Sequence, residues 1–201
     1  MDEAKIQLSE EEMVLVRNGE WILTKNRIIQ KVYQLFGSLA STMTDELEES
    51  RLPHELRRTP PKISKGENYR GFPYVVLDCP RNFSKNDIFA IRTFFWWAHY
   101  FSVTLHLKGT FRDRLQDNIL ANRQLLSTQN FCLVTAHNEW EHDLAAAGPI
   151  SFRELTKADL EKRFSELPFL KITSVLELKD WNVSAEGLAR ICRTLLQSVG
   201  G

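Results

Sequence analysis

Three polar side chains interrupt the most apolar part of this sequence, and their types suit acid–base or anion-binding chemistry. Asp78, Arg92 and His106 fall within residues 72–108, a stretch made largely of aliphatic and aromatic residues. A histidine beside an aspartate and an arginine could act as a general base, with the arginine holding an anionic substrate group. Asp78 or Glu177 would orient the imidazole, whose ordinary pKa of about 6.5 suits proton transfer near neutral pH.

The same three residues also have a purely structural interpretation, which the sequence favours. One face of an antiparallel sheet is often solvated, and its polar residues pair across strands without any function. A buried arginine needs a partner, and Asp78 could neutralise Arg92 in a structural pair. A cavity holding Asp78, Arg92 and His106 together would favour an enzyme, whereas a buried Arg92–Asp78 pair would favour a binding protein.

A second group of charged residues suggests an anion-binding loop. The basic residues that could hold a phosphate or carboxylate are Arg57, Arg58, Lys62 and Lys65. The spacing of a phosphate-binding P-loop is absent, and the expected strand follows the group instead of preceding it. Nucleic-acid binding would need a larger basic excess and exposed aromatic side chains. We therefore expect a solvated, charged loop and no nucleic-acid partner.

A metal site is the other chemistry that the sequence suggests and then disfavours. Residues 137–142 contain two histidines and two glutamates, but the histidines are five positions apart, whereas zinc-binding histidines on a helix are four apart. On a strand His137 and His142 would point to opposite faces, and His99 or His106 would have to supply a further ligand. The three cysteines form no CxxC pair, which indicates small buried side chains in a reducing compartment. We expect no metal and no cofactor.

The composition shows no bias toward a particular class of partner. The chain has 201 residues, of which 43% are hydrophobic, as in ordinary soluble domains. Basic and acidic residues both number 26, so no net charge attracts the chain to nucleic acid or to a membrane surface. The N-terminus has no apolar signal region, and the longest apolar run, residues 94–98, is far shorter than the roughly 20 residues of a spanning helix. We expect a soluble, cytoplasmic protein.

Two helices are predicted in the N-terminal part. Ser9 and Glu12 have the spacing of a capping box, which starts a short helix that ends near Asn18 and Gly19. A second helix is predicted over residues 24–50, with Thr24 as its cap and Gly37 in close packing. Its apolar stripe consists of Ile29, Val32, Phe36, Leu39, Met43 and Leu47. At roughly 40 Å, this helix is longer than a compact domain requires, so it either crosses the whole sheet or serves self-association or a protein partner.

Residues 86–98 have two interpretations, which lead to different folds. Ser84 could cap a helix there, but four consecutive aromatic residues at 94–97 favour a strand. We predict a hairpin that turns near residues 98–99, followed by a strand over residues 100–108 in which apolar and polar residues alternate. A helix leading into that strand is the alternative.

The complete pattern predicts an α+β fold, with a mainly antiparallel sheet of about five strands and helices packed on one side. Further strands are expected at residues 72–78, 131–136 and 169–178, and further helices at about 110–127, from Thr156, and from Ser184. We predict one domain over residues 1–201, with an N-terminal helical segment (1–50), a basic, proline-containing loop (51–71) and an α+β core (72–201).

The functional hypothesis at this point is a non-catalytic binding or interaction protein. The sequence contains no GxSxG, GxGxxG or HExxH motif, so it carries no recognisable catalytic signature. The overlong amphipathic helix favours a protein partner. The alternative is a small-molecule enzyme that uses Arg92, His106 and Asp78 on an anionic substrate, and a small-molecule ligand is compatible with either hypothesis.

Overall fold

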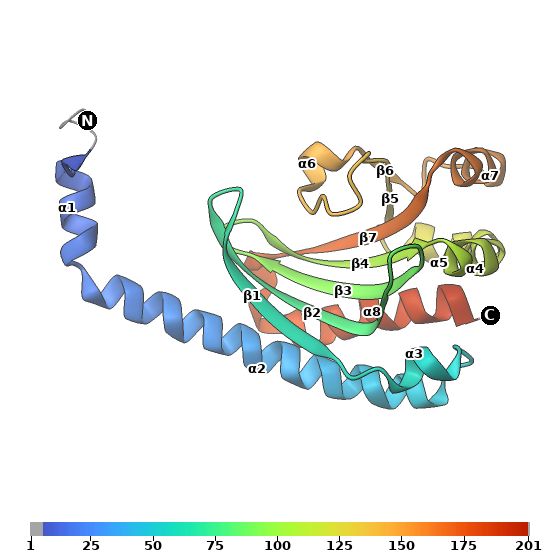
Figure 1. Ribbon diagram of the computed structural model, residues 1–201, viewed down its shortest axis with the longest axis horizontal. Coiled ribbons are helices and arrows are strands. Elements are labelled where there is room, and N and C mark those ends of the chain that lie inside the picture. The colour runs from blue at the N-terminus through green and yellow to red at the C-terminus, as the bar shows by residue number, and fades with distance from the viewer. Residues whose placement is uncertain (1–5, 201) are drawn as a thin grey trace.

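An antiparallel sheet of seven strands forms the centre of the structure (Figure 1). The computed structural model describes residues 6–200. Its helices are α1 (Glu10–Arg17), α2 (Gly19–Glu49), α3 (His54–Arg58), α4 (Thr110–Ala121), α5 (Arg123–Thr128), α6 (Leu144–Ala147), α7 (Lys157–Glu166), the 3-10 helix η2 (Leu178–Val183) and α8 (Ser184–Gly200). Its strands are β1 (Lys62–Tyr69), β2 (Phe72–Phe83), β3 (Ile88–Trp96), β4 (Tyr100–Lys108), β5 (Cys132–Val134), β6 (Pro149–Ser151) and β7 (Phe169–Glu177). They lie in the order β1-β2-β3-β4-β7-β5-β6, and all neighbours are antiparallel.

One face of the sheet packs against helices, as the sequence predicts. Alternate residues of β4, among them Phe101, Val103 and Leu105, point to this face and are fully buried, because side chains alternate across a strand. The helices α2 and α8 run along the same side of the sheet (Figure 1) and contribute Phe36 and Leu195 to the same apolar core. This core holds the strands in register beneath the candidate site.

The opposite face of the sheet is buried too, although the sequence favoured a solvated one. Ser102, Thr104 and His106 point to this face, with 3%, 5% and 5% of their surface exposed. Residues 135–148, which include α6, lie over them on the side away from α2 and α8 (Figure 1). We call this segment the covering loop. Because this loop covers them, the polar residues on this face of the sheet are buried instead of solvated.

The hairpin predicted for residues 86–108 is confirmed, and the helical alternative is wrong. β3 pairs with β4 from Ile88 opposite Lys108 to Trp96 opposite Tyr100. The run of four consecutive aromatic residues fits a strand because the side chains of neighbouring residues point to opposite faces of the sheet. Phe95 joins the core beneath the helices, whereas Phe94 and Trp96 form a separate aromatic group on the covered face.

The two N-terminal helices are confirmed, with changes in detail. The capping box of α1 is present, with Ser9 N donating to Glu12 at 2.8 Å and Glu12 N donating to the Ser9 hydroxyl at 3.2 Å. α2 begins at Gly19 instead of Thr24, because the Asn18 side chain accepts from Trp21 N and caps it earlier. Gly37 faces open space, so the close packing expected there is wrong. None of the helices in the described residues is long and apolar enough to cross a membrane.

The sheet has seven strands instead of about five, and part of the difference lies in the expected loop at residues 51–71. Within that range, His54–Arg58 form α3 and Lys62–Tyr69 form β1, an edge strand paired with β2. β1 lacks an apolar alternation because it lies at the rim of the sheet, where charged residues protect an exposed edge. The other additional strand is β6, whose three residues pair with β5.

Candidate functional site

Asp78 and Arg92 lie directly opposite each other on β2 and β3, on the covered face of the sheet. The guanidinium donates from Nε to Asp78 Oδ1 at 2.7 Å and from Nη2 to Oδ2 at 3.0 Å. Both side chains are largely buried, with 7% of Asp78 and 18% of Arg92 exposed. A two-point ion pair of this kind satisfies both charges inside the protein. Arg92 therefore neutralises Asp78 and is not free to bind a substrate carboxylate or phosphate.

Other side chains enclose the Arg92 guanidinium. Its Cζ lies 5.5 Å from the ring centres of both Phe83 and Trp140, within the range of cation–π attraction. Its Nη1 lies 3.3 Å from His142 Nε2. Because arginine can only donate, Nε2 of His142 must be the acceptor and cannot carry a proton in this arrangement. Burial, followed by the nearby charges of Lys171 and Arg92, lowers the pKa of His142 to about 2.

His106 lies on the same face but is a weak base. Burial, followed by the positive charges of Lys171, Arg92 and Lys108, lowers its pKa to about 3. Its Nε2 is 3.4 Å from Glu139 Oε2, and neither atom has a hydrogen-bond partner in the described residues. A general base works best when its pKa is near the operating pH. An imidazole of this basicity is neutral at pH 7 and accepts a proton from substrate poorly.

The covering loop is built to hold its own shape. It joins β5 to β6, and its ends meet where Thr135 N donates to Ala147 O at 3.2 Å and Thr135 Oγ1 donates to Gly148 O at 2.8 Å. Gly148 has a φ of 58°, a left-handed conformation that glycine adopts at little cost. Asp143 caps the short α6 by accepting from Ala145 N at 2.9 Å. The loop is therefore an ordered element and not a loose connection.

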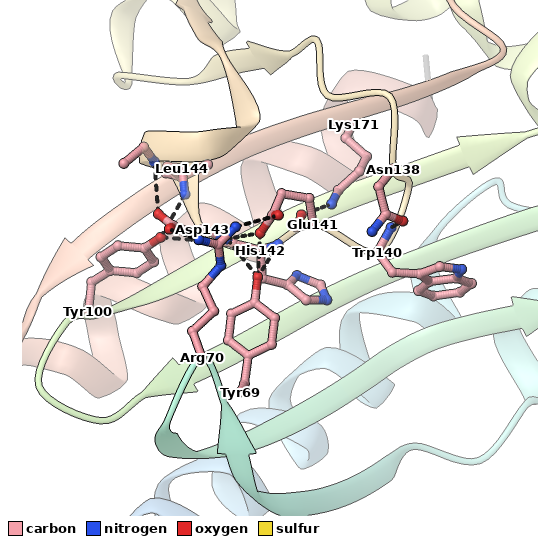
Figure 2. Close-up of polar contacts among 11 residues, drawn as sticks. Tyr69, Arg70, Tyr100, Asn138, Trp140, Glu141, His142, Asp143, Leu144 and Lys171 are labelled. Carbon is pink, nitrogen blue, oxygen red and sulfur yellow. Dashed lines mark hydrogen bonds and ion pairs between the residues drawn. The ribbon is translucent and has the colours of Figure 1, made fainter.

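Glu141 attaches the tip of the loop to the turn between β1 and β2 (Figure 2). It accepts hydrogen bonds from the Tyr69 hydroxyl and from Arg70 Nη2, the latter at 2.8 Å. Burial alone raises the pKa of Glu141, but the hydrogen bonds from Tyr69, the Asp143 amide and Arg70 outweigh it and lower the pKa to about 2. Its backbone carbonyl also accepts from Lys171 of β7. One residue thus links the loop to both halves of the sheet.

Two tyrosine hydroxyls complete the attachment by binding the loop backbone (Figure 2). Tyr69 accepts from His142 N at 2.8 Å and Asp143 N at 3.0 Å, and Tyr100 donates to His142 O and accepts from Leu144 N, both at 3.0 Å. Burial raises the pKa of Tyr100 to about 12 and also raises that of Tyr69. Both phenols therefore stay protonated near neutral pH, and their hydroxyl groups hold the loop backbone in place.

The charges beneath and around the covering loop cancel. The positive side chains are Arg70, Arg92, Lys108 and Lys171, and the negative ones are Asp78, Glu139, Glu141 and Asp143. Burial, followed by the charge of Arg92, lowers the pKa of Lys171 to about 8, so it remains mostly charged at pH 7. With four charges of each sign and two neutral histidines, the cluster leaves no surplus charge to attract an ionic substrate or metal.

Comparisons with protein-family models, with curated proteins and with solved structures find no match to this chain. Within residues 6–200, no group of three or more histidine, cysteine, aspartate or glutamate side chains is arranged to hold a metal ion.

The four basic residues expected to bind an anion are not brought together by the structure. Arg57 and Arg58 belong to α3, whereas Lys62 and Lys65 belong to β1. The two lysines are three positions apart on a strand, so they point to opposite faces of the sheet. Lys62 lies opposite Asp78 in the register of β1 and β2.

A second candidate site lies at the N-terminal end, on residues 6–23, which we call the arm. α1 has no buried residue, and with the first turn of α2 it projects beyond the edge of the sheet (Figure 1). The exposed large apolar side chains of the arm are Ile6, Leu8, Met13, Val14, Leu15, Val16, Trp21, Ile22 and Leu23. Of the two roles expected for this helix, crossing the sheet or serving a partner, the apolar stripe of α2 fits the first, because it is buried against the sheet from Ile29 to Leu47. The surface available to a partner precedes that stripe.

Sequence reasoning identified Asp78, Arg92 and His106 but missed the residues that attach the loop and the residues of the arm. For the residues that attach the loop, the sequence signal was the density of charged and aromatic residues at 137–142, together with a lysine within strand β7. For the residues of the arm, the signal was four successive apolar residues, 13–16, in a helix too short to bury them. Neither signal says which surface would meet these side chains.

Proposed function

We propose that this chain is a protein-interaction module that binds another polypeptide through its N-terminal arm. The observation that carries the proposal is the exposure of nine large apolar side chains on residues 6–23, among them Val14 at 67% and Val16 at 68%. Contiguous apolar surface of this kind is rare on monomeric proteins and marks sites of interaction. The arm presents these side chains on a segment in which no residue is buried.

The short length of α1 supports the same proposal. Isolated helices shorter than about 12–15 residues are marginal in water, and most helices in proteins depend on a packed apolar face. α1 has 8 residues and no buried side chain, so the described part of the chain offers it almost no tertiary support. A partner that covers Met13 to Val16 would supply that support. Folding of α1 would then be coupled to binding.

The chemistry of the covered sheet face favours binding over catalysis. Arg92 is committed to Asp78 by two hydrogen bonds, and the pKa of His106 is lowered to about 3. Neither residue is prepared for the role that an enzyme would give it near neutral pH. Their side chains are also covered by residues 135–148, so a substrate would first have to displace an ordered loop.

The charge of the arm indicates the class of partner. Glu10, Glu11 and Glu12 fill the first turn of α1, and Glu20 follows in α2. Acidic side chains are repelled by the phosphates of nucleic acids and by anionic lipid headgroups. The arm therefore suits a protein surface that is apolar at its centre and basic at its rim.

Site-specific crosslinking tests the proposal. A photoreactive amino acid replaces Val14 in the full chain, which is then expressed in cells that naturally make the protein. We expect a discrete crosslinked product that disappears when Val16→Glu is added, because a buried carboxylate would disrupt the apolar contact. The matched control carries the photoreactive group at Val183, which is 57% exposed and lies outside the arm. Equal labelling at both positions, unaffected by Val16→Glu, would refute the proposal.

A further inference from the structure

An apolar cavity of about 380 Å³ lies beside α2, close to where the arm ends at residue 23. Its walls include Ile28 of α2, Phe95 and Trp97 near the hairpin turn, and Leu178 and Trp181 of η2. The Phe95 ring meets those of Trp97 and Trp181 edge to face, at 6.2 and 6.1 Å between centres. Aromatic walls of this kind bind aliphatic side chains well. The cavity is therefore a receptor for apolar groups.

The rim of this cavity is basic on the side of α2. Lys31 lines the cavity and forms no ion pair in the described residues. Arg27 lies one helical turn before it, so both cations project from one side of α2, where Arg27 donates to the Thr24 hydroxyl at 2.7 Å and lies 3.9 Å from Glu20 in an exposed pair. Lys31 also borders a second hollow, which contains Arg27 and Leu23 and continues along the helix. The receptor therefore has an apolar centre and a basic edge.

We infer that the arm of one copy of this chain docks in this cavity on a second copy, and that the exchange is reciprocal. The inference rests on the proposed function and names the partner. Leu15 and Val16 of the incoming α1 would enter the aromatic cavity, and Glu11 and Glu12, one turn earlier on the same side of the helix, would face Arg27 and Lys31. Glu11 and Leu15 are four residues apart, as are Arg27 and Lys31. Each pair therefore lies along one side of its helix, so acidic and apolar groups meet basic and aromatic ones.

The link between α1 and α2 excludes docking of α1 within its own chain. Only Asn18 separates the two helices, since α1 ends at Arg17 and α2 begins at Gly19. Two antiparallel helices that pack against each other need a connection of about 2–5 residues. α1 therefore cannot turn back along α2 to reach Ile28, which lies about 14 Å from the start of that helix. Trp21, in the first turn of α2, lies edge to face with Trp97 of its own cavity, at 6.2 Å between ring centres. α1, by contrast, is held away from that cavity and is free to reach the cavity of another molecule.

The size of the reciprocal contact suits a stable dimer. Each copy would contribute the twelve residues 6–17 and the seven residues that line the cavity, which together make nineteen and reach the lower end of a standard interface. Standard protein interfaces use about 20–30 residues a side. Because each copy offers both an arm and a cavity, a two-fold axis near the start of α2 closes the assembly and leaves no apolar arm exposed.

Light scattering coupled to size exclusion, carried out on the purified full chain over a range of concentrations, tests the inference. We expect twice the mass of one chain, and we expect Val16→Glu or Lys31→Glu to raise the dimer dissociation constant at least about tenfold, which corresponds to about 1.4 kcal/mol. The matched controls are Val183→Glu and Lys162→Glu, which change exposed residues outside both surfaces. Circular dichroism of each variant verifies that the fold is retained.

Two mixing experiments distinguish docking from a general loss of solubility or structure. Glu11→Lys combined with Lys31→Glu should restore much of the dimer by reversing both charges. An equimolar mixture of Val16→Glu and Lys31→Glu chains should form heterodimers, because the first retains an intact cavity and the second an intact arm. A monomer at all concentrations, or a dimer unaffected by Val16→Glu, would overturn the inference. If Val14 then still crosslinks to a different protein, the proposed function stands without self-association.

Discussion

Arg92 and Asp78 form a two-point ion pair across β2 and β3, with donor–acceptor distances of 2.7 and 3.0 Å. The covering loop lies over this pair, and His142 of that loop contacts the guanidinium. The pair is thus part of the interior of the protein and a support for the loop. Its role is structural, because the two buried charges satisfy each other.

Removing one charge of the pair should be costly, whereas removing both should not. We expect Asp78→Asn to lower the free energy of unfolding by about 3–5 kcal/mol, because it leaves a buried arginine without its counter-charge. The double variant Asp78→Leu with Arg92→Met should lie near the parent stability or above it. Urea unfolding measures the free energy of unfolding of the parent chain, the single variant and the double variant. A loss below about 1 kcal/mol for Asp78→Asn would mean that the pair is solvated.

The Tyr69 hydroxyl should control the stability of the covering loop more than that of the whole chain. Tyr69→Phe removes the acceptor for two backbone amides, those of His142 and Asp143. We expect faster amide hydrogen exchange across residues 135–148, equivalent to about 1–3 kcal/mol of local opening. Tyr74→Phe is the control, because Tyr74 belongs to the same aromatic group but its hydroxyl has no partner in the described residues. Equal protection in both variants would contradict the assignment.

The free energy of unfolding should decrease as the pH is lowered below about 6.5, because two histidines are buried in their neutral form. The pKa values of His106 and His142 are lowered to about 3 and about 2, whereas both rings titrate near 6.5 in the unfolded chain. The unfolded state therefore binds more protons between those values, and folding loses about 1.4 kcal/mol per pH unit for each histidine. Above pH 6.5 neither histidine contributes to the slope.

Urea unfolding between pH 6.5 and pH 5 isolates this effect from the carboxylates, which titrate lower. We expect His106→Gln to reduce the slope of unfolding free energy against pH by about 1.4 kcal/mol per unit. The groups around His106 are Lys171, Arg92, Lys108 and Glu139, which remain unchanged in the variant. His54→Gln is the matched control, since His54 lies on the exposed surface of α3. A slope equal to that of the parent chain would show that His106 titrates normally.

Two glycine substitutions should have opposite effects. Gly148→Ala should destabilise the covering loop by about 1–2 kcal/mol, because its φ of 58° is left-handed and a Cβ would lie 2.7 Å from Thr135 Oγ1. Gly37→Ala should instead stabilise the chain by about 0.5–1 kcal/mol, since that position is within α2 and faces open space. Thermal unfolding compares the two variants. A loss of stability for Gly37→Ala would mean that the position is packed.

The sequence was sufficient for those parts of the fold that carry their own periodicity. The alternation along residues 100–108 and the stripe from Ile29 to Leu47 correctly identified β4 and the buried side of α2. β1 was missed because it carries mostly polar residues at the sheet edge, where burial imposes no pattern. Local signals therefore identified interior elements and failed at the rim.

The sequence predicts only part of the candidate site, because the rest depends on how distant strands pair in the sheet. The predicted hairpin fixes the register of Arg92 and His106, and the pairing of β2 with β3 places Asp78 opposite Arg92 on the same face. What covers that face depends on residues 135–148, which have no helical or strand period and are brought to the site by the pairing of β5 with β7 and by hydrogen bonds to Tyr69 and Tyr100. The same limit applies to the arm, whose apolar residues are evident in the sequence although their exposure is not.

The one-residue link at Asn18 makes connection length a determinant of assembly. A longer link would allow α1 to turn back and cover Ile28 and Trp181 of its own chain, so the same contacts would close within one molecule. Insertion of a few glycine residues after Asn18 should therefore convert an exchanging dimer into a self-capped monomer, without change to any contacting side chain. In this chain, the length of the link between α1 and α2 would determine whether the same contacts form within one molecule or between two.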